Sequence, residues 1–305
     1  MPLLTNGPSR FLGGRGGIAT PIPTYGAELV SNGEFTTNTT GWSASTEGDI
    51  TRRDFASSPN IAPTGGADNY GAEVWRDTLN NSAYALTNVS VTIDKWYLIT
   101  CRAYAPSANT GVNAHQLAFS GLNTRGTVED AWQSLAIVTR FTSGAYIIIW
   151  AQSSTLNDKA YYDAVSAKEI ALASMFSGAA KADANQDVSA PVTLGLLGTR
   201  AAVCARVDSL SAPTSFLIAS HNGTNARLTE LYGGTYTEHI NTAVTYVAGA
   251  PIRIWVSGTT AKLYYNGVQV STNKTVNAGL TGTIFGKFNT FGGNQIGACT
   301  IVPAV

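Results

Sequence analysis

Apolar and polar residues alternate with a period of two along most of this chain. The alternating segments are rich in Thr, Val, Ile, Tyr and Trp, and Gly, Asn, Pro or Ser interrupts them about every ten residues. Short alternating segments separated by turn residues are typical of all-β sandwiches. The segment 160–170 follows this pattern and leads into a stretch of Ala, Ser and Gly. We interpret it as the last strand of a first β domain, because the same pattern begins again after it.

The length supports two such domains. A chain of 305 residues suits about two domains that each bury their own core. The predicted fold class is all-β, with two tandem antiparallel β-sandwiches (jelly rolls) behind an extended N-terminal arm. We expect the arm at residues 1–26, the first sandwich at 27–172, a linker or the first strand of the next domain at 173–189, and the second sandwich at 190–305.

The arm is rich in Pro and Gly. Because Pro lacks a backbone donor and Gly is conformationally free, this segment predicts neither a long helix nor a central strand. A purely solvated tail needs no large apolar residues, so four of them are candidates for anchoring the protein to a particle: Leu3, Leu4, Phe11 and Leu12. Two interpretations stay open, an arm that docks into grooves of a neighbouring subunit and a poorly ordered terminus.

Charge and cysteine usage exclude several functions. Charged residues make up 12 % of the chain, and 19 Lys and Arg balance 19 Asp and Glu. We therefore expect no binding to nucleic acid or to an anionic membrane. No apolar run approaches the length of about 18 residues that a membrane span needs. Cys101, Cys204 and Cys299 match neither a metal spacing nor a disulfide framework, which favours free thiols.

Residues 1–20 lack an apolar run of signal-peptide length. A neutral surface rich in Thr, Ser and Asn is nevertheless expected of proteins that work outside a cell or on a particle. We therefore expect a protein that is made in a host cytoplasm without an export signal and that resides on the surface of a virion released by lysis.

Residues 27–171 resemble a known family. Asn-Gly-Glu-Phe at 32–35, Gly-Trp at 41–42 and Tyr-Tyr-Asp-Ala-Val-Ser-Ala-Lys-Glu-Ile at 161–170 look like the two ends of a xylan- and cellulose-binding carbohydrate-binding module of the jelly-roll type. The intervening segments 89–104 and 131–146 are similar to inner strands of that family. The resemblance implies a jelly-roll fold, and a structural calcium held beside the paired ends by Glu34 and Asp163, with Glu73 as a third ligand by position. Carboxylates in turns suit this cation, although both residues also suit plain turn-capping roles.

A sugar-binding face needs exposed aromatic rings flanked by amides and other hydrogen-bonding groups. Five residues on predicted strands are candidates to line such a concave face: Trp75, Trp150, Tyr104, His115 and Gln116. Trp42, Trp96 and Trp132 are at positions where packing is the better interpretation. Burial in the core is the alternative for every Trp in the set.

The clearest signal in the second half is a β-hairpin. Residues 252–256 alternate, Ser257-Gly258 turns the chain, and Asn266-Gly267 predicts a type I′ turn between two further strands. The segment 255–268 resembles the strand, hydroxyl-rich turn and Tyr-x-Asn-Gly hairpin of concanavalin-like and laminin-G-like sandwiches. That resemblance covers residues 190–300 and implies a fold, since such sandwiches serve lectins, enzymes and spacers alike.

No catalytic arrangement is recognisable. Glycosidases need two carboxyl groups across one bond, but Glu129 and Asp130 are adjacent and so would face opposite ways in a strand. The three histidines, His115, His221 and His239, show no metal spacing. We predict no enzyme, and no cofactor other than the structural calcium.

The leading hypothesis is a bacteriophage virion surface protein, as a capsid decoration, head fibre or tail fibre component. It would be anchored by its arm and would bind host-surface polysaccharide weakly and multivalently. Expected partners are other virion proteins, host glycans and further copies in closed homo-oligomers such as trimers. Two alternatives stay open, a cement or spacer protein without a ligand, and a carbohydrate-binding accessory part of a polysaccharide-degrading enzyme.

Overall fold

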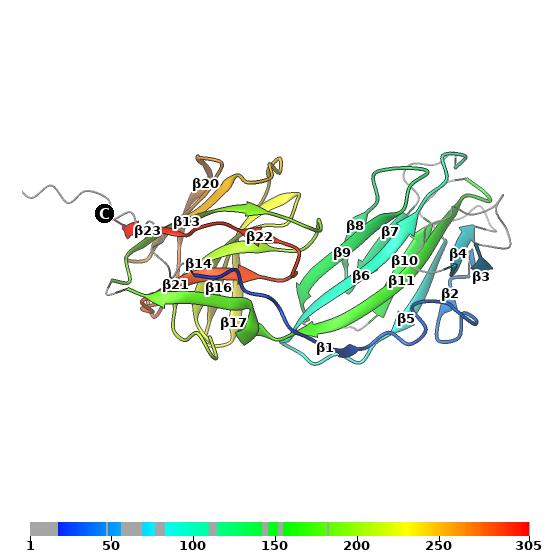
Figure 1. Ribbon diagram of the computed structural model, residues 1–305, viewed down its shortest axis with the longest axis horizontal. Coiled ribbons are helices and arrows are strands. Elements are labelled where there is room, and N and C mark those ends of the chain that lie inside the picture. The colour runs from blue at the N-terminus through cyan, green and yellow to red at the C-terminus, as the bar shows by residue number, and fades with distance from the viewer. Residues whose placement is uncertain are drawn as a thin grey trace, which may run out of the picture. The chain divides into compact units, whose positions relative to one another are not determined.

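A computed structural model describes residues 18–46, 48–55, 69–76, 83–109, 115–141, 146–151, 155–181 and 183–304 (Figure 1). Across these residues the regular elements are antiparallel β-strands, apart from the single 3-10 turn η1 (Leu172–Met175). This confirms the all-β class. Within the same residues, no helix is long and apolar enough to cross a membrane. The anchoring candidates Leu3, Leu4, Phe11 and Leu12 lie outside the described residues.

The chain divides into two compact units. One comprises Tyr25–Ile170, and the other combines Met1–Thr24 with Ala171–Val305. We call them the first and the second sandwich. This differs from the expected tandem order. The N-terminal segment belongs to the second sandwich, although the first sandwich lies between the two in the sequence. The first sandwich is thus inserted into the second.

The first sandwich consists of a six-stranded sheet, with strand order β3-β4-β11-β6-β9 and β1 paired to β11, and a five-stranded sheet, with order β2-β5-β10-β7-β8. Its strands are β1 (Tyr25–Glu28), β2 (Ser43–Ala44), β3 (Gly48–Asp54), β4 (Tyr70–Arg76), β5 (Ala83–Asn88), β6 (Trp96–Tyr104), β7 (His115–Phe119), β8 (Leu122–Arg125), β9 (Gln133–Arg140), β10 (Tyr146–Ala151) and β11 (Lys159–Ile170).

Strand β11 confirms the predicted last strand of this sandwich and lies near the middle of its sheet (Figure 1). Its pairing with β6 shifts register between Asp163 and Ser166, which marks a β-bulge. At the bulge, Val165 N donates to Gly33 O at 3.0 Å. A Cβ on residue 33 would lie 1.9 Å from Val165 O, so only glycine fits this close approach. The Asn-Gly-Glu-Phe turn is therefore fixed against the bulge.

The second sandwich also consists of two sheets. One has strand order β12-β21-β14-β15-β16-β17, and the other has order β20-β19-β18-β13-β22 with β23 paired to β13. The strands are β12 (Phe176–Ala180), β13 (Gln186–Thr193), β14 (Ala201–Val207), β15 (Phe216–His221), β16 (Asn225–Tyr232), β17 (Thr235–Ala243), β18 (Pro251–Ser257), β19 (Thr260–Tyr265), β20 (Val268–Thr275), β21 (Ile284–Asn289), β22 (Gln295–Ile296) and β23 (Thr300–Pro303).

Two predictions from the sequence concern this sandwich. The hairpin is confirmed: Asn266 and Gly267 join β19 to β20 with φ of 49° and 81°, as a type I′ turn requires. The segment 173–189 is not a linker, because it contains most of η1, all of β12 and the start of β13. Of the two alternatives, it carries strands of the next domain.

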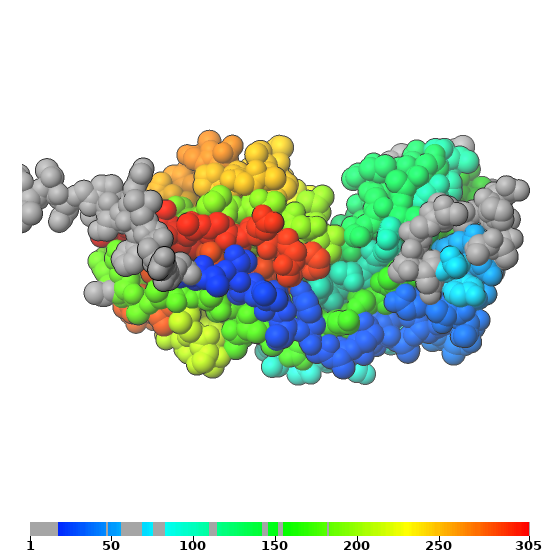
Figure 2. Space-filling view, in the orientation of Figure 1, coloured from blue at the N-terminus to red at the C-terminus, as the bar shows by residue number. Residues whose placement is uncertain are grey.

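The described end of the N-terminal segment lies against the second sandwich of its own chain (Figure 2). Side chains of strand β21 hold its backbone: Lys287 Nζ donates to Ile18 O at 2.7 Å, and Asn289 Nδ2 donates to Pro21 O at 3.1 Å. Ser177 on β12 donates to Ala19 O, and the Ile18 side chain packs on the core. Residues 18–24 are thus a built-in part of this sandwich rather than a free arm.

Candidate functional site

A row of aromatic and polar side chains crosses the outer face of the five-stranded sheet. Trp150 on β10 is directly opposite Tyr84 on β5 and Gln116 on β7, and Gln116 is directly opposite Arg125 on β8. We call these four residues the Trp150 row. They point away from the core because their chain neighbours Ala85, Ile149 and Leu117 point into it.

The two rings of the row form a half-exposed platform. Tyr84 and Trp150 are both partly buried, and their ring centroids lie 6.1 Å apart at 47°. The next row on the same face is more apolar, with Leu86, Ile148 and Ala118 directly opposite one another. Tyr146, at the start of β10, is 41 % exposed. The face therefore offers rings and apolar surface over three strands.

Gln116 and Trp150 carry polar atoms that no group of the described residues satisfies. Gln116 is fully buried, yet neither its Oε1 nor its Nε2 has a hydrogen-bond partner, and the indole Nε1 of Trp150 is buried without one as well. Leaving such a group unpaired costs about 1–3 kcal/mol, so most native proteins pair it. The row thus holds unused donors and an unused acceptor beside two aromatic rings. Because Gln116 has no exposed surface, a ligand reaches its amide only after a neighbouring side chain shifts.

Tyr162 supports the row from below. It belongs to β11 in the opposite sheet, its ring lies in the core, and its hydroxyl reaches the backbone of both central residues. Gln116 N donates to the hydroxyl at 2.7 Å, and the hydroxyl donates to Trp150 O at 2.5 Å. Burial raises the pKa of Tyr162 well above its ordinary value, so the hydroxyl keeps its proton. This contact fixes β7 and β10 where the ligand-facing side chains leave the sheet.

His115 lies inside the sandwich, not on the face where the sequence analysis placed it. It is fully buried and directly opposite the core residue Ala151. Gln133 Nε2 donates to its Nε2 at 2.8 Å, and its Nδ1 has no partner. Burial lowers the pKa of His115 to about 4, so the ring is neutral near pH 7. A neutral, enclosed imidazole has a packing role here.

Trp75 and Tyr104 are on the outer face of the other, six-stranded sheet. Trp75 is directly opposite Lys159, while Tyr104 donates its hydroxyl proton to Asp130 at 3.1 Å. The Tyr104 ring belongs to a small aromatic cluster with Phe55, Tyr161 and Trp132. Phe55 and Tyr161 are 2 % and 1 % exposed, so much of this cluster is closed to a ligand. The five predicted glycan residues are therefore divided between two faces and the interior, and only Trp150 and Gln116 come together.

Glu73 is engaged by cations. It is 1 % exposed, with Oε1 2.7 Å from Arg53 Nη2 and Oε2 3.6 Å from Lys159 Nζ. The hydrogen bond to Glu73 raises the pKa of Arg53, and burial followed by the charge of Glu73 raises that of Tyr161. This buried carboxylate holds β3, β4 and β11 together. Its oxygens face ammonium and guanidinium groups, which does not fit the role of third calcium ligand.

The other two calcium candidates flank the bulge of β11. Glu34 is exposed, whereas Asp163 is fully buried and accepts a hydrogen bond from Ala164 N at 2.7 Å. Across the residues that the structure describes, no three His, Cys, Asp or Glu side chains gather into a metal site. A calcium ion held by Glu34 and Asp163 with backbone oxygens stays a prediction.

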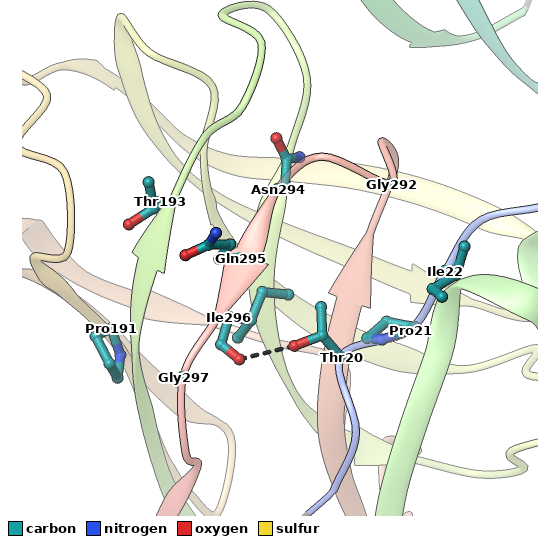
Figure 3. Close-up of a pocket in the computed structure, with 10 residues that line it drawn as sticks. All are labelled: Thr20, Pro21, Ile22, Pro191, Thr193, Gly292, Asn294, Gln295, Ile296 and Gly297. Atoms are coloured by element: carbon teal, nitrogen blue, oxygen red, sulfur yellow. Dashed lines mark hydrogen bonds between the residues drawn. The ribbon is translucent and has the colours of Figure 1, made fainter.

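A hollow of about 510 Å³ lies on the second sandwich beside the N-terminal segment (Figure 3). Thr20, Pro21 and Ile22 form one side of it, and Thr20 Oγ1 donates to Ile296 O at 2.9 Å. Asn294 on its rim is buried, and its side-chain amide forms hydrogen bonds with Gly195, Thr199, Asn289 and Arg200. The described residues that line the hollow include no charged side chain and no unpaired buried amide, so it is a weaker candidate than the Trp150 row.

Sequence reasoning missed Tyr84, Arg125 and Tyr162 as members or supports of the site. The sequence could have predicted Tyr84 on the outer face, because it alternates with Ala83 and Ala85 and successive strand residues point to opposite faces. The same rule excludes a shared face for His115 and Gln116. The role of Tyr162 could not be predicted from the sequence, since Tyr162 contacts β7 and β10 from the other sheet.

Comparisons with known proteins leave the function open. No protein-family model matches the chain, and no curated protein matches it. Among solved structures, the tandem CBM22 domains of Paenibacillus barcinonensis Xyn10C share 8 % identity over 93 % of this chain and 98 % of that chain, with a TM-score of 0.35. Sheep galectin-11 in complex with glycerol shares 7 % over 42 % of this chain and 96 % of that chain, with a TM-score of 0.32.

The arabinose-bound MgGH51 α-L-arabinofuranosidase shares 10 % identity over 54 % of this chain, with a TM-score of 0.37, and this chain spans 31 % of that enzyme's length. The named structures include carbohydrate-binding modules and a galectin. At these identities and TM-scores the likenesses carry no argument about function. The functional conclusion rests on the residues of the site.

Proposed function

We propose that the protein is a non-enzymatic glycan-binding protein and that the Trp150 row is its binding site. The observation that carries this proposal is the pairing of Gln116 and Trp150: unbonded amide and indole atoms adjoin an aromatic platform on one sheet face. Pyranose rings present apolar C–H faces to aromatic rings and hydroxyl groups to amides. A sugar therefore supplies both kinds of contact that this face lacks.

The proposed ligand is a neutral glycan. The Trp150 row has one charged member, Arg125, at its exposed end, and the described row beside it, formed by Leu86, Ile148 and Ala118, is apolar. The Arg125 guanidinium can donate hydrogen bonds to sugar hydroxyl groups, so the ligand does not need a carboxylate. A platform of this size contacts few sugar residues, so single-site affinity is weak and repetition on an assembly supplies avidity.

Affinity electrophoresis of the full chain in gels with soluble xylan or hydroxyethyl cellulose tests this function. We expect retardation by at least one of these neutral polysaccharides. Trp150→Ala and Gln116→Ala should each weaken it by about ten-fold or more, since each removes ring contact or a buried hydrogen-bonding group. Host-surface polysaccharide is the third probe in the same series.

The matched control is Trp75→Ala. Trp75 is also a half-buried strand tryptophan, but it belongs to the opposite face. Its removal should leave retardation unchanged. Equal loss in Trp75→Ala and Trp150→Ala, with both variants folded by circular dichroism, would show that the Trp150 row is not the site.

The virion setting is the second part of the proposal. Low charge, a surface rich in Thr, Ser and Asn, and two sandwiches without a recognisable catalytic pair support a decoration or fibre protein on a bacteriophage particle. In this setting the partners are other virion proteins, host polysaccharide and further copies of the chain. Residues 1–17 are the proposed anchor, because residues 18–24 are already engaged by the second sandwich.

Particles stripped of the protein provide the test. The full chain should rebind, and a version that begins at Ile18 should not, while both keep polysaccharide binding. Rebinding without polysaccharide binding would favour a cement or spacer protein. Failure of both versions to bind particles would remove the virion setting and leave a free glycan-binding protein.

A further inference from the structure

The outer face of the sheet β20-β19-β18-β13-β22 carries a second group of aromatic and charged side chains. Asp187, Trp255 and Lys262 are directly opposite one another across β13, β18 and β19. In the adjacent row, Arg253 is directly opposite Tyr264. These five residues, which we call the Lys262 face, point outward because Val188, Ile254 and Leu263 between them belong to the core.

Arg253 and Asp187 neutralise each other. Arg253 Nε and Nη2 lie 2.6 and 2.5 Å from the two oxygens of Asp187, a bidentate pair, and this hydrogen bonding raises the pKa of Arg253. The guanidinium also lies 4.6 Å from the ring centroid of Tyr264. Asp187 is 8 % exposed, so its charge is committed to Arg253 and not to an incoming group.

Lys262 is the charge that remains. Its Nζ lies 4.1 Å from the ring centroid of Trp255, and no carboxylate of the described residues comes within ion-pair distance of it; the nearby carboxylate of Asp187 is paired with Arg253. An indole ring holds a cation in place but leaves its positive charge and its donors available. The Lys262 face therefore presents a fixed ammonium group beside two half-buried aromatic rings.

We propose that the Lys262 face is a second glycan site and that it selects acidic sugars. A hexuronate residue joins the two features that the face complements: a carboxylate for Lys262, and apolar C–H groups for the parts of the Trp255 and Tyr264 rings that Lys262 and Arg253 leave exposed. A neutral sugar leaves the ammonium group without a partner. This site is independent of the Trp150 row, since it belongs to the other sandwich and uses none of the same residues.

The test uses the full chain and two matched probes, polygalacturonate and its methyl ester, which share a backbone and differ in charge. In affinity electrophoresis we expect stronger retardation by the acid than by the ester, and little retardation by the ester in Trp150→Ala, which lacks the neutral-glycan site. Lys262→Gln should weaken binding of the acid by about ten-fold, the loss expected for one charge-assisted contact. Higher salt should weaken it too, because the contact is exposed.

Lys274→Gln on β20 is the control, since it removes an equal charge from the same sheet outside the Lys262 face. Trp150→Ala is the second control and should leave binding of the acid unchanged while it reduces binding of neutral glycans. The proposal is overturned if the ester binds as well as the acid, if Lys274→Gln equals Lys262→Gln, or if poly-glutamate competes as strongly as polygalacturonate. The last result would identify a general polyanion surface that is open to acidic proteins.

Discussion

The buried imidazole of His115 makes the stability of the first sandwich depend on pH. Its pKa is about 4 in the folded chain, against about 6.5 for a free histidine. The unfolded chain therefore binds more protons between these values. The contribution of His115 is complete above pH 6.5 and is lost as the pH falls toward 4, by at most about 1.4 kcal/mol per pH unit.

Urea unfolding of the full chain between pH 4 and 7 measures this slope. His115→Gln should reduce it in the transition of the first sandwich, because the amide does not titrate. His221→Gln is the control: burial also lowers the pKa of His221, but this histidine belongs to the second sandwich. An unchanged slope in His115→Gln would mean that His115 titrates alike in the folded and unfolded chain.

Tyr162 is predicted to order the Trp150 row through one hydroxyl group. Tyr162→Phe keeps the ring in the core and removes the contacts to Gln116 N and Trp150 O, at a cost of about 1 kcal/mol in the free energy of unfolding. Hydrogen exchange at the Gln116 amide should accelerate, and retardation by a neutral glycan should fall.

Tyr97→Phe separates this effect from a general loss of stability. Tyr97 is also buried, and its hydroxyl accepts a hydrogen bond from Thr92 N at 2.8 Å, away from the row. The variant should lose similar stability with no change at Gln116. If both variants alter exchange at Gln116 alike, Tyr162 has no special relation to the row.

At the scale of elements, the N-terminal segment is expected to close one side of the second sandwich. The side chain of Ile18 packs on the core, whereas Ile22, four residues on, is 75 % exposed. Ile18→Ala should lower the free energy of unfolding of the second sandwich by about 1–2 kcal/mol, and Ile22→Ala should change it by less than about 0.5 kcal/mol. Denaturant unfolding of the two variants checks this, and equal effects would contradict it.

The elements that the sequence predicted are those with local signals. Asn266-Gly267 specifies its hairpin by two φ angles, and residues 160–170 of β11 show a rough alternation of apolar and polar residues. The segment 18–24 has no such signal. Its contacts join backbone carbonyls to Lys287 and Asn289, which lie more than 260 positions away in sequence. The local sequence pattern of this segment therefore predicts a loose arm, whereas its long-range contacts make it part of the second sandwich.

The candidate site shows the same division. Trp150 and Gln116 are recognisable by residue type, and strand alternation assigns them to a face. Which of the six tryptophans shares a face with the unpaired amide of Gln116 depends on the order of the strands in the sheets. Trp75 and Trp150 read alike in sequence, but β4 and β10 belong to different sheets.

For the whole molecule, the insertion predicts that the second sandwich folds without the first. Ala171 N donates to Thr24 O at 3.1 Å, so the two ends that the first sandwich leaves behind are adjacent. A chain that lacks residues 25–170, with a short Gly-Ser linker between Thr24 and Ala171, should show the β-type circular dichroism and cooperative unfolding of the second sandwich. A chain that begins at Ala171, and so lacks residues 18–24 as well, should be less stable. An unfolded product from the first deletion would contradict the division.

The inserted arrangement also decides how the protein carries mechanical load. A pull between residue 18 and residue 304 acts on two points of the second sandwich, since both belong to that unit. The contacts of Lys287, Asn289 and Ser177 with the N-terminal segment bear the force, and the first sandwich stays unloaded until they break. A tether of this kind would let a glycan-binding face keep its shape while the point of attachment is under tension.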